Sequence, residues 1–198
     1  MLRAIARSTA ALAASGLWGY AEATRFFIVP DVLIGWTALH GMRHGIRSAL
    51  AATVGAVLGG AAVHRDAPAQ HARLTEIPGI SAPLLSDAAE RFARNRWVAV
   101  MRAPLDGIPY KVYAARSALD GRPVEELLLW TVPARLWRFG LVAVGAGAFG
   151  AIFGRAIRRR EREFLVAYLA LWSITYVRYY AGLRRRYGAI RGSGTVRE

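Results

Sequence analysis

The sequence has 198 residues, of which 55% are hydrophobic, and its formal net charge is +14. It contains no cysteine, which excludes disulfides, thiolate metal sites and a cysteine nucleophile. All 27 basic residues except Lys111 are arginines, and they cluster beside apolar runs. That placement favours a protein that contacts anionic membrane lipid over one that binds nucleic acid, so nucleic acid is not expected as a partner.

The first 23 residues combine Arg3 and Arg7 with a run of small residues. Two interpretations are open: a cleaved signal or transit peptide, or a first membrane-associated helix that stays attached. We favour the attached helix, because the run is rich in alanine and is only weakly apolar for the core of a signal peptide.

An apolar stretch at residues 26–39 contains Pro30 and Asp31. A spanning helix needs about 20 residues, and this stretch is shorter. Pro30 lacks an amide donor and disfavours helical geometry at the residue before it. We therefore predict a broken helix that enters the membrane and turns back. His40 and His44 follow it on one helical face. A basic collar facing lipid headgroups is favoured there over a metal or haem site, since no third ligand is apparent, so no metal and no cofactor is expected.

The next segments are an apolar helix at residues 49–63 and a polar linker at about 64–83. Small residues at Gly55–Gly59 are spaced so that two helix backbones can approach closely in lipid. Residues 84–98 show the pattern of an amphipathic helix. We expect that helix to lie in the membrane interface, with packing against a soluble domain as the alternative.

A second short hairpin is predicted at residues 101–112, between apolar flanks. It places charges and helix breakers close together: Arg102, Pro104, Asp106, Pro109 and Lys111. Such a segment fits a re-entrant element of a membrane protein better than a water-soluble core. The alternative is that the prolines form surface turns and the charges extend to the membrane interface.

Beyond the hairpin, Pro133 is expected to kink a helix, with Arg135 and Arg138 on one face just after it. An apolar, glycine-rich helix then covers residues 141–153, and a last apolar segment covers residues 164–177. Together these segments predict an all-α integral membrane bundle that forms a single domain. Its parts are a first half at about 20–63, the linker at 64–83, a second half at about 84–154, and a C-terminal helix and basic tail at 155–198.

The two halves show signs of an inverted repeat. An offset of 80 residues places Glu22 on Arg102 and Asp31 on Lys111, so the two hairpins carry opposite charges. Each ionised side chain at membrane depth costs about 2.5–3.5 kcal/mol on insertion scales. The acidic and basic side chains should therefore lie close together or face a watered cavity, which is the plan of transporters built from repeated broken helices.

The order of these motifs resembles the DedA family, also called SNARE-associated Golgi or VTT-domain proteins. Those proteins have an acidic residue before a proline-containing re-entrant hairpin, then a helix with a small-residue core, a second hairpin with an arginine, and a later arginine segment. The segments that carry the resemblance are Glu22, Val29–Asp31, Gly55–Gly59, Arg102–Pro104, Ile108–Lys111 and Ala134–Arg138.

The resemblance implies a transporter that moves a phosphate-bearing lipid, either a polyprenyl phosphate or a phospholipid, between the leaflets of a bacterial inner membrane. Proton coupling is an option. The implied lipid-phosphate-binding residues are Arg102, Lys111, Arg135 and Arg138. The implied charge-pairing or proton-coupling residues are Glu22, Asp31 and Asp106. The prolines that shape the hairpins are Pro30, Pro104 and Pro109.

Other function classes remain as alternatives. A non-transporting membrane scaffold would use the small-residue pairs Gly55/Gly59 and Gly150/Gly154 for helix contacts. A membrane enzyme is not expected, because the sequence offers no convincing set of nucleophile, histidine and acid. Assembly into a homo-oligomer is left open.

Overall fold

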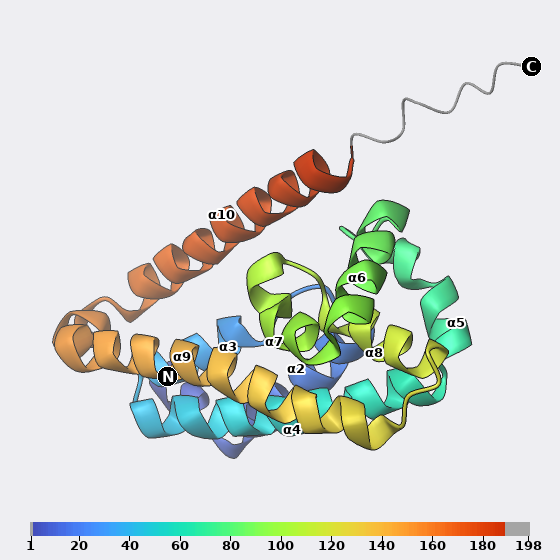
Figure 1. Cartoon of the computed structure of the whole chain (residues 1–198). Helices are drawn as coiled ribbons and strands as arrows, with labels where there is room; N and C mark the ends of the chain where they lie inside the picture. Colours follow the sequence, from blue (N-terminus) through green and yellow to red (C-terminus); the bar gives the residue numbers. More distant parts are fainter. Residues whose placement is uncertain (1, 189–198) are drawn as a thin grey trace, which may run out of the picture.

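The computed structural model describes residues 2–188, and every regular element within that range is helical. The prediction of an all-α chain is confirmed (Figure 1). The elements are α1 (Leu2–Ala6), α2 (Thr9–Thr24), α3 (Asp31–Leu39), α4 (Met42–Arg65), α5 (Ala67–Ala72), the 3-10 helix η1 (Leu74–Glu76), α6 (Ala82–Arg94), α7 (Arg96–Asp106), α8 (Tyr110–Leu119), α9 (Val124–Arg159) and α10 (Glu161–Tyr187).

Two helices of the described chain, α4 and α9, are long and apolar enough to cross a membrane. At 1.5 Å per residue they are about 36 and 54 Å long, against a hydrocarbon core of about 30 Å. They run antiparallel, side by side, along one face of the molecule (Figure 1). Their contact depends on Gly147, since a Cβ there would lie only 2.9 Å from the Cβ of Met42. These two helices suggest that the protein associates with a membrane.

Helix α2 packs parallel to α4 through small residues. A Cβ added at Gly55 would overlap the carbonyl oxygen of Gly16, and one at Gly59 would lie 2.8 Å from the carbonyl oxygen of Tyr20. The predicted role of Gly55–Gly59 in a close helix contact is therefore confirmed, and its partner is a helix of the same chain. The N-terminal alanine-rich run forms most of that partner helix.

The two short helices α3 and α8 have similar ends. Each begins directly after a proline, Pro30 or Pro109. Each is followed within two residues by a glycine with positive φ: Gly41 at 153° and Gly121 at 68°. Only glycine adopts such backbone angles without a steric penalty, so the chain can turn sharply there into the long helix that follows.

The segment before α8 differs from its prediction. One amphipathic helix was expected at residues 84–98, but the chain breaks at Asn95, whose side chain caps α7 by accepting a hydrogen bond of 3.1 Å from Val98 N. Pro104 lies inside the last turn of α7 rather than in the turn that follows, and it has no amide to donate to the carbonyl oxygen of Val100. The turn itself contains Gly107, at φ 75°.

The apolar face of α6 packs on α8 within the chain. Phe92 is 3% exposed and stacks on Tyr113, with ring centroids 5.9 Å apart. The sequence pattern identified the apolar face but could not identify what covers it.

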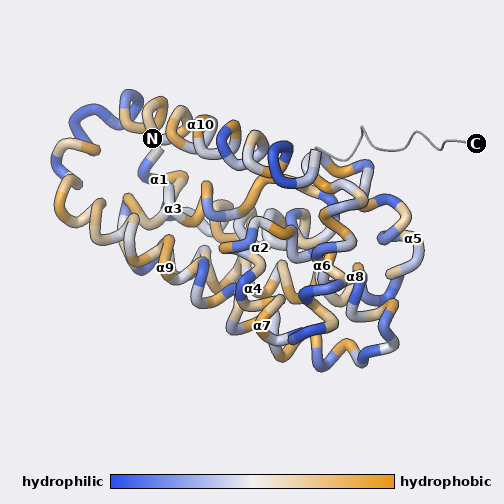
Figure 2. Tube along the Cα trace, turned by 45° about the horizontal axis from the view of Figure 1, so that its top comes forward, coloured by the Kyte–Doolittle hydropathy of each residue, from blue (hydrophilic) through white to orange (hydrophobic). Residues whose placement is uncertain are grey.

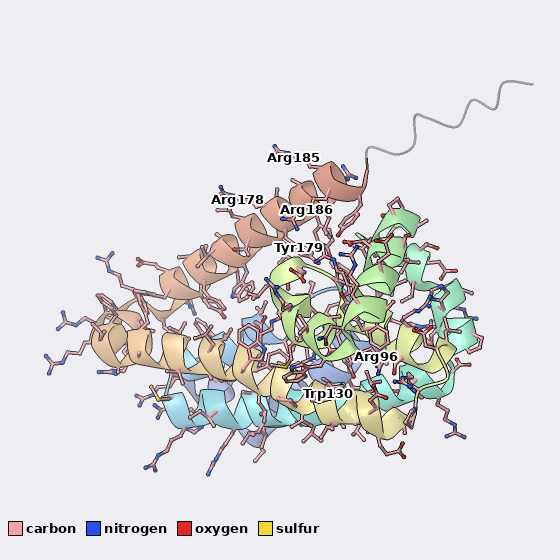
Figure 3. The ribbon with its side chains drawn as sticks, viewed as in Figure 1. Arg96, Trp130, Arg178, Tyr179, Arg185 and Arg186 are labelled. Carbon is pink, nitrogen blue, oxygen red and sulfur yellow. The ribbon has the colours of Figure 1, made fainter. Side chains whose placement is uncertain are left out.

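Helix α10 crosses back over the body of the molecule (Figures 1 and 2). The tube in Figure 2 is blue at the turn between α9 and α10, whereas orange segments recur along α9. Side chains on α10 fall on two faces (Figure 3): Tyr179 points toward the α7–α8 turn, whereas Arg178 and Arg185 point away from the bundle. The inward face of α10 therefore covers the centre of the molecule.

Candidate functional site

A cavity of about 190 Å³ lies at the centre of the molecule, where α2, α3, α7, α8, α9 and α10 meet. Its walls are largely apolar and aromatic, but five acidic or basic side chains line it: Glu22, Asp31, Lys111, Arg135 and Arg138. We call this space the central cavity. All five side chains come from segments that the sequence singled out, and four of the five residues are almost fully buried, at 1–5% exposed.

The first ion pair in the central cavity joins α2 to α9. Glu22, near the end of α2, lies with its Oε2 atom 2.9 Å from Nη2 of Arg135. The two side chains are only 7% and 4% exposed. The contact between these two atoms lacks hydrogen-bond geometry, so it is an ion pair and not a hydrogen bond.

The second ion pair joins α3 to α9. Asp31 is the first residue of α3, where the positive end of the helix dipole favours a carboxylate. Its Oδ2 atom accepts a hydrogen bond from Nη2 of Arg138. The other carboxylate oxygen, Oδ1, is buried and has no hydrogen-bond partner among residues 2–188. Buried polar atoms are rarely left unpaired, so this oxygen marks a place for water or a polar ligand.

Lys111 is the third cationic group of the central cavity. It lies at the start of α8, is 1% exposed, and donates a hydrogen bond of 2.7 Å from Nζ to the carbonyl oxygen of Phe26. That bond ties the second hairpin to the chain just before the first one. With Arg135 and Arg138 the cavity holds three cationic side chains against the two carboxylates of Glu22 and Asp31.

The guanidinium of Arg135 is held in place by an aromatic support. It lies 4.5 Å from the ring centroid of Tyr110, at cation–π distance. The hydroxyl groups of Tyr110 and Thr131 are 2.6 Å apart, which fixes the Tyr110 ring against α9. Gly60 on α4 makes room for it, since a Cβ at Gly60 would lie 3.0 Å from Cζ of Tyr110.

The tyrosines of α10 cover the central cavity, and sequence reasoning missed them. Tyr176 accepts a hydrogen bond of 2.7 Å from Val29 N, and Tyr179 donates one of 2.7 Å to the carbonyl oxygen of Gly107. These contacts tie α10 to both hairpins. The available signal was the aromatic spacing of four residues on one helical face, at Tyr168, Trp172, Tyr176 and Tyr180.

Two predicted site residues lie outside the central cavity. Arg102 is exposed, because residues 100, 103, 104 and 107 form the cavity-facing side of α7 and residue 102 is on another face. Asp106 forms an ion pair with Arg91 of α6, at 3.1 Å. The expectation that these two side chains join the charged cluster is corrected: among the basic side chains expected near Glu22, Arg135 forms the ion pair and Arg102 does not. Pro104 and Pro109 do line the cavity.

The histidine pair was weighed as a metal or haem site. His40 is buried, and its Nε2 atom lies 4.0 Å from Oε1 of Glu161. Burial lowers the pKa of His40, and this effect outweighs the opposing influence of Glu161. Within residues 2–188 there is no group of three or more histidine, aspartate or glutamate side chains placed to hold a metal ion.

The arrangement in the central cavity can exchange one anion for another. Guanidinium groups bind carboxylates and phosphates through the same forked geometry, so a phosphate could replace Glu22 or Asp31 beside Arg135 or Arg138. A proton on either carboxylate would weaken its hold on the arginine and favour that replacement.

Comparisons with known proteins do not indicate a function for this chain. No family model matches the chain, and no curated protein or solved structure matches it. The DedA resemblance therefore rests on the sequence motifs alone, and five of their charged residues line the central cavity: Glu22, Asp31, Lys111, Arg135 and Arg138.

Proposed function

We propose that this protein is a DedA-like membrane transporter that moves a phosphate-bearing lipid between leaflets, in a bacterial inner membrane. The observation that carries the proposal is the pair of buried ion pairs, Glu22–Arg135 and Asp31–Arg138, on the wall of one cavity. Arg135, Arg138 and Lys111 would bind the lipid phosphate. Glu22 and Asp31 would neutralise the arginines when no lipid is bound.

Buried ion pairs of this kind contribute little net stability. Burying two charges costs several kcal/mol per ion, and well-packed apolar residues in their place are often as stable or more stable. In a membrane the cost of a charged side chain is about 2.5–3.5 kcal/mol even on the lowest scales. Two buried pairs beside one cavity are therefore better explained by a ligand than by folding.

The arrangement of the helices supports a transporter plan. The offset of 80 residues that aligns Asp31 with Lys111 also aligns α3 with α8, and it aligns the glycines after them, Gly41 and Gly121. Helix α3 packs on α9 of the other half, and α8 packs on α4. The antiparallel pair of α4 and α9 fits two re-entrant hairpins related as an inverted repeat, with the binding site between them.

The size of the central cavity indicates which part of a lipid it would take. A volume of about 190 Å³ is smaller than the pockets that enclose whole drug-sized ligands, which start at about 300 Å³. The cavity fits a phosphate headgroup, and the acyl chains would remain in the membrane. Uptake of a proton by Asp31 or Glu22 would release an arginine for the phosphate, which gives proton coupling a physical basis.

The scaffold alternative depends on helix-contact glycines being free to bind a partner. Gly55 and Gly59 already contact α2, and Gly150 is packed against the carbonyl of Leu39. Of the four glycines weighed for this role, only Gly154 has no contact with another helix in the described chain. These contacts favour the transporter over the scaffold.

The proposal is tested by lipid translocation in reconstituted vesicles. Headgroup-labelled phosphatidylglycerol in both leaflets is exposed to a membrane-impermeant quencher, and the rate at which inner-leaflet label becomes accessible is measured. We expect protein-containing vesicles to exchange lipid faster than empty ones. Arg138→Gln should lower the protein-dependent rate about tenfold or more, because hydrogen bonds to charged groups contribute about 1.5–3 kcal/mol.

The matched control is Arg178→Gln, which makes the same change at an exposed position whose side chain points away from the bundle (Figure 3). It should exchange lipid at the rate of the unaltered protein. Equal rates for Arg138→Gln and Arg178→Gln, in folded protein, would contradict the assigned role of the cavity. Exchange no faster than in empty vesicles would contradict transport itself.

A further inference from the structure

A second, larger pocket lies at the far end of α9, away from the central cavity. Its volume is about 510 Å³, and it is enclosed by α1, the turn between α3 and α4, and the last turns of α9. Four arginines line it: Arg3, Arg7, Arg155 and Arg158. We call it the terminal basic pocket. The function proposed above makes no use of it.

The charges of the terminal basic pocket are not balanced. No carboxylate lines it, and within residues 2–188 none of its four arginines lies within 4.0 Å of an acidic oxygen. Glu161 lies beside His40, which lines the pocket, and its Oε1 atom is 4.0 Å from Nε2 of that histidine. Four guanidinium groups around one space repel each other, so an anion that enters it relieves the repulsion as well as forming hydrogen bonds.

The pocket is shaped as well as charged. The Arg7 guanidinium donates hydrogen bonds to the carbonyl oxygen of His40, one of them from Nε at 3.0 Å. This contact holds Arg7 beside the turn between α3 and α4. Gly147 and Gly150 let α9 pack closely against Met42 and Leu39, so one side of the pocket is a tight contact between α9 and the turn between α3 and α4.

The position of the pocket along α9 indicates which class of anion it would bind. It lies where the apolar part of α9 ends and the run Arg155–Arg160 begins, which is the headgroup level of a membrane that α9 crosses. Basic pockets between helices at that level bind the headgroups of anionic lipids. We propose that the terminal basic pocket binds the phosphate of an anionic lipid headgroup. The proposal shares with the proposed function only the placement of α9 across the membrane.

The test is lipid binding by the full-length protein in a neutral detergent, measured by native mass spectrometry during titration with phosphatidylglycerol or phosphatidylcholine. We expect selective retention of phosphatidylglycerol. Arg3→Gln/Arg155→Gln should weaken it about 30-fold, because each arginine near an anionic lipid contributes about 1 kcal/mol and 1.4 kcal/mol is a factor of ten. The control is Arg178→Gln/Arg185→Gln, two arginines that point away from the bundle (Figure 3), which should lose less than about threefold.

Inorganic phosphate distinguishes a lipid headgroup from a free anion. If phosphate at the same concentrations leaves the bound phosphatidylglycerol in place, the lipid is the ligand. If phosphate displaces it, the pocket is a general phosphate site and the lipid assignment is overturned. Equal losses for the two double variants would overturn the site altogether. Arg7→Lys keeps the charge but removes the forked donor, so a loss of lipid by this variant in folded protein supports the geometry of the pocket.

Failure of this proposal is distinguishable from failure of the transporter. Arg3→Gln/Arg155→Gln leaves every residue that lines the central cavity unchanged. Conversely, Arg138→Gln does not alter the terminal basic pocket, so it should lose only lipid bound in the central cavity and keep the bound phosphatidylglycerol that Arg3→Gln/Arg155→Gln removes.

Discussion

The central cavity and the terminal basic pocket differ in whether acidic side chains pair with their arginines. In the central cavity, Arg135 and Arg138 are each paired with a carboxylate from another helix. In the terminal basic pocket, Arg155 and Arg158 are exposed and no acid pairs with them in the described chain. Both sites are lined by residues of α9, about 20 residues apart along one helix.

The difference follows from the surroundings of each site. A buried charge must be compensated within the protein, since the cost of leaving it unpaired exceeds a large part of a typical protein's stability. A charge at the level of lipid headgroups stays hydrated and can bind an anion that comes from outside the protein. The burial of each position on α9 therefore decides whether its arginine has a partner in the chain, and the comparison can be tested by removing charges at each site.

The largest effect is expected at Arg135. Arg135→Met leaves Glu22 buried without its partner, and breaking such a pair costs about 3–5 kcal/mol. The midpoint of thermal unfolding in detergent, followed by the helical circular dichroism signal, should fall clearly. Glu22→Gln/Arg135→Met should recover most of the loss, because no charge is then left uncompensated. A double variant as unstable as Arg135→Met would show that the ion pair does not explain the burial of Glu22.

Much of this site was visible in the sequence. Pro30 and Pro109 predicted the breaks before α3 and α8, and Asp31 and Lys111 were expected near each other. Both line the central cavity. Spacing along a chain is enough for such predictions, because a proline followed by a charged residue in an apolar stretch restricts both the backbone and the surroundings.

The pairing of the charges was not visible. The sequence indicated only that the acidic and basic side chains should lie close together, and the rotation of α7 about its axis directs Arg102 outward. That rotation depends on Asn95, which separates α6 from α7 and caps the N-terminus of α7. The cover of the cavity by α10 was missed for a related reason, since the contacts of Tyr176 and Tyr179 join segments 147 and 72 residues apart. A pattern within one helix cannot predict contacts between residues that are so far apart in the sequence.

A smaller effect is expected at Gly60, which supports the central cavity without touching its charges. Gly60→Ala places a Cβ against the Tyr110 ring, and overpacking of this kind costs about 1–3 kcal/mol. The ring would shift away from Arg135, so lipid exchange in vesicles should fall together with the unfolding midpoint. Gly140→Ala is the control, because a Cβ at Gly140 meets nothing within 4 Å. Equal stability of the two variants would show that Tyr110 is not held by this packing.

The smallest effect is expected at the terminal basic pocket. Arg155→Gln/Arg158→Gln removes two charges that have no acidic partner in the described chain, so the free energy of unfolding should change by less than about 0.5 kcal/mol. Lowering the salt concentration should increase the stability of this variant relative to the unaltered protein, since repulsion between exposed like charges is weakly screened at low ionic strength. A loss comparable to that of Arg135→Met would mean that these arginines do have partners within the folded chain. The contrast between the two depths of α9 would then be lost, because both groups of arginines would serve the fold.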